Sequence, residues 1–127
     1  MDIVIRYVFK HRFSGNIEIR RYSIRQLEER SAQKLSPCFN ETDYELIARN
    51  LFTGLKDKNG VDIYEGDVVQ GSLRSHGDVG PIMRKVYMHK GCYMFGVWNA
   101  HEYFNKHQHI EVVGNIYEDP DLWEEAQ

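Results

Sequence analysis

A run of eighteen residues in the middle of the chain, FTGLKDKNGVDIYEGDVV at positions 52–69, constrains the fold more than any other segment. It holds an Asn-Gly pair, Asn59 and Gly60, and a second turn signal at Gly66 and Asp67. Asn-Gly favours a tight turn because both residues accept a positive φ at little steric cost. The segment therefore predicts short strands joined by tight turns, and it places no catalytic group in an activated setting.

The first third of the chain alternates apolar and polar residues at period two, the pattern of a half-buried strand. One face carries Ile3, Ile5, Tyr7, Phe9 and Phe13, and the other carries Arg6, Lys10 and Arg12. Gly15 interrupts the pattern, which resumes at residues 17–20 and so predicts a β-hairpin. Ser23 followed by Gln26 is a capping-box signature and predicts a short helix after the hairpin.

The rest of the chain predicts a second subdomain. Residues 34–42 lack periodicity and contain Pro37, so they indicate a connector between the subdomains 1–36 and 37–127, which could also pack as one compact domain. Residues 43–52 fit a strand or a helix, and we favour a strand. Beyond them, about five short strands with Gly-rich turns indicate a small SH3-like barrel or a strongly bent sheet. With a terminal helix where Asp119 precedes Pro120, the predicted fold class is α+β: an N-terminal β-hairpin plus helix, then a mostly antiparallel SH3-like β-barrel with a short C-terminal helix.

Composition narrows the class of protein. The chain has 127 residues, of which 42% are hydrophobic and 28% charged, as in an ordinary globular domain. No apolar run approaches the ~20 residues that span a bilayer, and Asp2 stands where a secretory signal carries positive charge, so we expect a cytoplasmic protein without membrane contact. Residues 1–34 carry eight Lys and Arg against four Asp and Glu, and the rest carries eight against fifteen. The electrostatic fields of the basic first part and the acidic remainder partly cancel at distances beyond the Debye length of ~10 Å, so net charge does not select a partner.

Few side chains have a spacing that points to chemistry. His107 and His109 would place two imidazoles on one face of a strand, with Glu102 or Glu111 as a third metal ligand, but a zinc site needs three or four ligands in a fixed shell. We therefore expect neither a metal nor a cofactor there. Asp57, Asn59 and Asp67 sit at turns, where such side chains usually bond to the local backbone. The two cysteines, Cys38 and Cys92, lack zinc-site spacing, and no enzymatic activity is expected.

The run at 52–69, joined to VVGNIYEDP at 112–120, resembles the YopX family of phage and prophage proteins. The positions that carry the resemblance and that we expect to be structural include Gly54, Asp57, Asn59, Gly60, Ile63, Tyr64, Gly66, Asp67, Gly114, Asn115 and Tyr117. The resemblance implies a phage or prophage origin, a C-terminal β-barrel-like part and an N-terminal part that varies among members. It brings no catalytic residue, because none is established for the family.

Two classes of function fit these observations. The first is a non-enzymatic accessory protein that binds a host or phage protein in the bacterial cytoplasm, through edge strands that would also allow a homo-oligomer. The second is a nucleic-acid-binding module that uses the basic hairpin and the aromatic residues of the barrel. Its contacts would be Arg6, Lys10, Arg12, Arg20 and Arg21, with Tyr87, Tyr93, Phe95 and Trp98 stacking on bases beside Arg84, Lys85 and Lys90. Residues 71–81, rich in glycine, predict a mobile loop where binding can occur.

Overall fold

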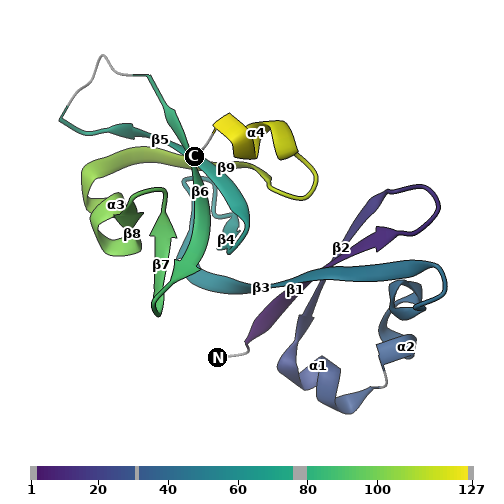
Figure 1. Cartoon of the computed structure of the whole chain (residues 1–127). Helices are drawn as coiled ribbons and strands as arrows, with labels where there is room; N and C mark the ends of the chain where they lie inside the picture. The colour runs from purple at the N-terminus through teal and green to yellow at the C-terminus, as the bar shows by residue number, and fades with distance from the viewer. Residues whose placement is uncertain (1–2, 31, 76–79, 126–127) are drawn as a thin grey trace. The chain divides into compact units, whose positions relative to one another are not determined.

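The computed structural model describes residues 3–30, 32–75 and 80–125. It divides into two compact units, Met1–Phe52 and Thr53–Gln127 (Figure 1). The division falls within strand β3 (Tyr44–Lys56), which continues from the first unit into the second. The sequence-based division between residues 36 and 37 lies inside the first unit.

The first unit is a small antiparallel sheet followed by short helices. Its elements are β1 (Val4–His11), β2 (Ile17–Ser23), α1 (Ile24–Glu29), α2 (Ala32–Leu35), the 3-10 helix η1 (Pro37–Phe39) and the first part of β3. Strand β1 lies between β2 and β3 and pairs with both antiparallel. The predicted hairpin and the predicted strand after residue 43 are therefore confirmed.

The start of α1 shows that local sequence signals decide this part of the fold. Ser23 Oγ accepts a hydrogen bond from the Gln26 N–H at 3.2 Å, and Gln26 Oε1 accepts one from the Ser23 N–H at 2.9 Å. The predicted capping box is thus confirmed. Next to it, an aromatic cluster packs on one face of β1, where the Tyr7, Phe9 and Tyr22 rings lie with centroids 5.1 to 5.7 Å from the Phe39 ring.

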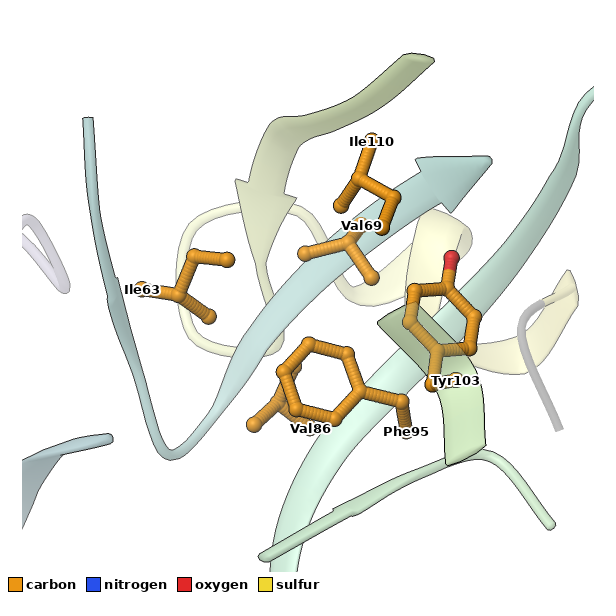
Figure 2. Close-up of a cluster of buried hydrophobic side chains, with 6 residues drawn as sticks. All are labelled: Ile63, Val69, Val86, Phe95, Tyr103 and Ile110. Carbon is orange, nitrogen blue, oxygen red and sulfur yellow. The ribbon is translucent and has the colours of Figure 1, made fainter. Parts of the chain in front are cut away.

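The second unit is built on a five-stranded antiparallel sheet of order β8-β7-β6-β5-β9. Its elements are β4 (Asp62–Tyr64), β5 (Asp67–Leu73), β6 (Ile82–His89), β7 (Cys92–Phe95), β8 (Trp98–Asn99), α3 (Ala100–Lys106), β9 (His107–Asn115) and α4 (Pro120–Glu125). The hydrophobic core of this unit, shown in Figure 2, contains Ile63, Val69, Val86, Phe95, Tyr103 and Ile110. The terminal helix begins at Pro120, as predicted.

The predicted fold class, α+β with an SH3-like barrel, is wrong. Within the described residues, the strands form two open sheets, the five-stranded one above and a four-stranded one of order β2-β1-β3-β4, and the few helices are short. Closing a barrel requires the first and last strands of one sheet to pair with each other. Alternation and turn residues report local geometry, so they predict strands correctly but do not determine which strands meet.

Strand β9 departs from regular pairing at two places. Opposite β5, the register shifts between Val68 and Val69 and again between Gln70 and Ser72, and at each shift β9 contributes one extra residue. His109, at the second shift, has a φ of +56°. These are β-bulges, which bend a strand and turn the side chains that follow to the other face.

Candidate functional site

Three apolar side chains of β3 lie at the surface of the first unit. Leu46, Ile47 and Leu51 are 44%, 39% and 41% exposed, and they are called here the β3 apolar group. Leu46 lies opposite Phe9 and Leu51 opposite Ile5, so both share a face of the sheet. An apolar side chain that stays exposed on an ordered strand is a candidate for partner contact, more so when several gather together.

A bulge in β3 places Leu46 on the same face of the sheet as Leu51. Val8 pairs with Ala48 but Phe9 pairs with Leu46, so Ile47 is an extra residue in β3. In the sequence, adjacent apolar residues at 46 and 47 resemble core positions, and sequence reasoning did not single them out. Neighbouring residues in a regular strand face opposite sides of the sheet. Leu46 and Ile47 therefore could not both face the core of a regular strand, and this was the signal that the sequence offered.

The five basic residues proposed for nucleic-acid contact have different surroundings. Arg6 is only 2% exposed, and its Nε donates to Asn50 Oδ1 at 3.1 Å, so its guanidinium does not lie on the exposed face that alternation predicted. Arg12 is exposed and donates to the Glu41 carbonyl at 2.8 Å. Lys10 and Arg21 are exposed. The hairpin therefore does not bring all five charges together on one surface.

Arg20 makes two contacts within its own strand. Its Nη1 lies 3.3 Å from Glu18 Oε2 and donates to the Ile19 carbonyl at 2.9 Å. The two charged side chains, 42% and 37% exposed, form a surface ion pair. Such a pair adds little stability, but it lowers the net positive charge that a phosphate would meet.

Asp57 organises the turn between β3 and β4. Its Oδ1 accepts from the N–H groups of Asn59 and Val61 at 2.8 and 2.9 Å, and its Oδ2 accepts from the Val112 N–H at 2.9 Å. Burial alone would raise the pKa of Asp57, but these three donors, with nearby Lys58, hold that pKa below its ordinary value of 3.8. The side chain is therefore a charged acceptor for backbone groups, which is the turn role that the sequence predicted.

Asp57 also joins the turn to the edge of the five-stranded sheet. The Lys58 N–H donates to the Ile110 carbonyl at 2.8 Å, next to the bond from Val112 to Asp57. Strand β9 is the last strand of that sheet. The turn thus occupies main-chain groups in the middle of an edge that would otherwise be open to another strand.

Most of the other family-motif positions also serve the backbone. Asp67 Oδ2 accepts from the Tyr64 N–H at 2.8 Å, and Asn115 Oδ1 accepts from the N–H groups of Tyr117 and Glu118 at 3.0 and 2.8 Å. Gly66 has a φ of +91°, which disfavours any side chain. Of the remaining positions, Gly54 and Gly60 have φ of +85° and +79°, Ile63 and Tyr64 are buried, and Gly114 lies against Asp119.

The two histidines suggested as metal ligands are separated by the bulge in β9. His107 is 2% exposed, its Nδ1–H donates to the Tyr103 carbonyl at 2.9 Å, and its ring stacks on the Tyr103 ring at 4.2 Å. His109 is exposed. The expectation of two imidazoles on one face is therefore wrong, because the extra residue at His109 reverses the alternation. Across the described residues, no group of three or more His, Cys, Asp or Glu side chains could hold a metal ion.

Burial sets the protonation behaviour of this cluster. It lowers the pKa of His107, and nearby Arg84 and Arg74 lower it further, although the bond to Tyr103 acts the other way. It also raises the pKa of Tyr103 to about 12. The Tyr103 hydroxyl lies close to Gly71, where an added Cβ would come within 2.7 Å of it. Gly71, Tyr103 and His107 are thus closely packed in the core of the second unit.

The aromatic residues considered for base stacking are largely structural. Phe95 is fully buried and stacks on Tyr103 at 4.9 Å, and Trp98 packs edge-on against His107 at 5.5 Å. The Tyr87 hydroxyl donates to the Gly96 carbonyl at 2.8 Å, beside Lys85, whose Nζ lies 5.5 Å from the ring centre. These aromatic residues therefore do not form a set of exposed rings along one strand.

A shallow hollow of about 370 Å³ is lined by Cys92, Tyr93, Asn99, Ala100 and His101, and His101 is hydrogen-bonded to Asn105 at 3.1 Å.

Of the predicted loop at 71–81, the first three residues belong to β5, and residues 76–79 lie outside the described residues. None of the helices in the described parts of the chain is both long and apolar enough to cross a membrane.

Comparison with known proteins finds a matching family model and a similar solved structure. The family model described as YopX protein matches residues 8–124. Among solved structures, the chain is similar to the crystal structure of protein EF1440 from Enterococcus faecalis, with 24% sequence identity, coverage of 91% of this chain and 74% of that chain, and a TM-score of 0.46. No match is found among curated proteins.

Proposed function

Because the chain belongs to the YopX family, we propose that it is a phage or prophage accessory protein that binds a host or phage protein and catalyses no reaction. The β3 apolar group is the observation that carries this proposal. Leu46, Ile47 and Leu51 remain roughly two-fifths exposed although they lie on an ordered strand beside a well-packed aromatic cluster. A protein partner that covered these side chains would remove apolar surface from water.

A protein partner fits this surface better than a nucleic acid does. Phosphate binding depends on several Lys and Arg side chains that reach the backbone together. In the hairpin, Arg6 is buried and Arg20 is paired with Glu18, whereas the neighbouring β3 surface offers aliphatic side chains. Nucleic-acid binding through the basic hairpin is the alternative that the experiment must separate. We place the protein in the cytoplasm of the bacterial host.

The test is capture of partners from a lysate in which the prophage has been induced. Tagged wild-type protein is compared with a Leu46→Ser/Leu51→Ser variant and with Val97→Ser, a control at a side chain of the second unit that is 77% exposed. All samples are run with and without nuclease, and bound proteins are identified by mass spectrometry. Circular dichroism and thermal melting verify that the variants are folded.

We expect a protein that survives nuclease, is retained by Val97→Ser and is lost with the double variant. Loss of about tenfold or more in captured partner is the expected size for removing two central apolar contacts. Capture that disappears with nuclease would establish the nucleic-acid alternative instead. Equal capture by wild type and the folded double variant would show that the β3 apolar group is not the binding surface.

A further inference from the structure

Strand β2 is an edge strand with a defined set of outward main-chain groups. The bonds from the His11 N–H to the Asn16 carbonyl and from the Ile24 N–H to the Ile3 carbonyl are both 2.9 Å long, and they fix which residues of the hairpin exchange hydrogen bonds. In an antiparallel pair, such residues alternate with residues whose N–H and C=O point away. The even-numbered residues of β2 therefore face β1, and Ile17, Ile19 and Arg21 direct their main-chain groups outward.

Two observations support this direction. The Ser23 N–H, next in the outward series, donates to Gln26 Oε1 at 2.9 Å rather than to β1. The Ile19 carbonyl accepts from the Arg20 side chain at 2.9 Å. A carbonyl oxygen has two lone pairs, so Ile19 can accept a second hydrogen bond from another strand. In the sheet order of the described strands, β2 is the terminal strand beyond β1.

The charges of β2 are self-complementary in one antiparallel register. Two identical strands related by a two-fold axis pair with residues of the same parity opposite each other, because the axis preserves the faces of the sheet. If Ile19 lies opposite Ile19 of the second copy, then Glu18 lies opposite Arg20 in both directions. Ile17 then lies opposite Arg21, and Ile19, whose outward main-chain groups the pairing uses, forms a hydrogen-bonded pair with Ile19 of the second copy.

The neighbouring registers place like charges together. A shift that puts Arg20 opposite Arg20 brings two guanidinium groups face to face and requires the Ser23 N–H, which Gln26 already occupies. A shift the other way puts Glu18 opposite Glu18. Like charges directly opposite each other destabilise a strand pair, whereas opposite charges stabilise it. The existing contact between Arg20 and Glu18, at 3.3 Å, already holds both side chains on the same face.

We propose that two copies of this chain associate through β2, antiparallel about a two-fold axis, with Ile19 opposite Ile19. The pairing joins two four-stranded sheets edge to edge and covers β2, the outer edge of the first unit. It uses β2 and not the exposed side chains of β3, so it is independent of the partner proposed above. The occupant is a second copy because the same strand supplies both charges that the register requires.

Charge exchange tests the register. Sedimentation of the full chain gives the dimer dissociation constant for wild type, Glu18→Arg, Arg20→Glu and the double exchange Glu18→Arg/Arg20→Glu. Each single variant places like charges opposite each other twice, and we expect at least about tenfold weaker association. The double exchange restores both opposite-charge pairs and should return the constant to within about threefold of wild type. Arg25→Glu and Glu28→Arg, at exposed positions of α1, are the matched controls and should leave it unchanged.

Disulfide trapping gives an independent readout. In a Cys92→Ser background, which removes the exposed thiol, cysteine is placed singly at 18, 19 or 20. Only Ile19→Cys should cross-link under mild oxidation, because residues opposite each other in a hydrogen-bonded pair have Cα atoms about 5.5 Å apart, within disulfide range. Any of three results would overturn the proposal: a wild-type chain that is monomeric at every concentration tested, a double exchange that does not restore association, or preferred cross-linking at position 18 or 20. A dimer that captures no other protein would leave it standing while refuting the proposed function.

Discussion

At the scale of single residues, the role of Asp57 is structural, because its side chain stabilises the second unit. One carboxylate accepts three backbone N–H groups, from Asn59, Val61 and Val112. Asp57→Asn replaces one acceptor oxygen with a donor and leaves an N–H without its partner. We expect a loss of about 2 to 3 kcal/mol in unfolding free energy, measured by urea denaturation.

Asp62→Asn is the matched control for Asp57→Asn. Asp62 forms an ion pair with Lys56 at 3.5 Å through Oδ1, which is buried and accepts no hydrogen bond from the described residues, although the side chain as a whole is 42% exposed. Loss of that ion pair should change stability by no more than about 1 kcal/mol. If both variants behaved alike, the three backbone bonds would not be the source of the stability.

Gly66 is a second residue whose role is conformational. Its φ of +91° is costly for any residue with a Cβ, and its N–H and C=O bond to Val86 and Ile116 at 2.8 and 2.9 Å. Gly66→Ala should lower the unfolding free energy by about 1 to 3 kcal/mol, and loss of binding should follow from loss of folding. Wild-type circular dichroism and melting temperature in a variant that no longer binds its partner would instead assign Gly66 to the binding surface.

At the scale of elements, the bulge at His109 decides which side chains of β9 reach the core. The extra residue lets both His107 and Ile110 be buried, although they are three positions apart. Because His109 has a φ of +56°, His109→Gly relieves a left-handed conformation and should be neutral or stabilising by up to about 1 kcal/mol. His109→Val should be destabilising, because a β-branched side chain resists that conformation.

Gln108→Gly separates relief of the bulge from a general effect of glycine in β9. Gln108 lies opposite Ser72 in the ladder with β5, and glycine at such a strand position should cost about 0.5 to 1 kcal/mol. Thermal melting of the three variants gives the comparison. A destabilised His109→Gly would mean that the imidazole itself supports the strand.

At the scale of the whole molecule, acid should weaken the second unit in two steps. Burial lowers the pKa of His107 in the folded chain. As pH falls, His107 is therefore protonated in the unfolded chain before it is protonated in the folded chain, and the unfolding free energy decreases below the ordinary pKa of 6.5. The pKa of Asp57 is also lowered, so its contribution is present above 3.8 and disappears as pH falls through the lower folded value. The ring of Trp98 packs against His107 in this unit, so its fluorescence reports the unfolding.

His107→Gln should remove only the first of these steps. The neutral amide does not titrate, so the unfolding free energy should be nearly flat from about pH 7 to 5, and the later loss below pH 3.8 should remain. An unchanged first step in this variant would place the titrating group elsewhere.

The sequence by itself determined the features that depend on residues close together in the chain. These are the hairpin at the N-terminus, the capping box of Ser23 and Gln26, the turn held by Asp57 and the start of the helix at Pro120. Each involves bonding groups within a few positions, so composition and spacing are sufficient to indicate them.

Only the tertiary structure decided which strands meet and what they bury. Long-range pairing, together with bulges that shift the register, decided three features. These are the two open sheets in place of a barrel, the burial of Arg6 and His107, and the exposure of Leu46 and Leu51. A one-residue shift exchanges the two faces of a strand without changing its sequence pattern. For that reason the candidate binding surface on β3 could not be predicted from alternation, whereas the turns beside it could.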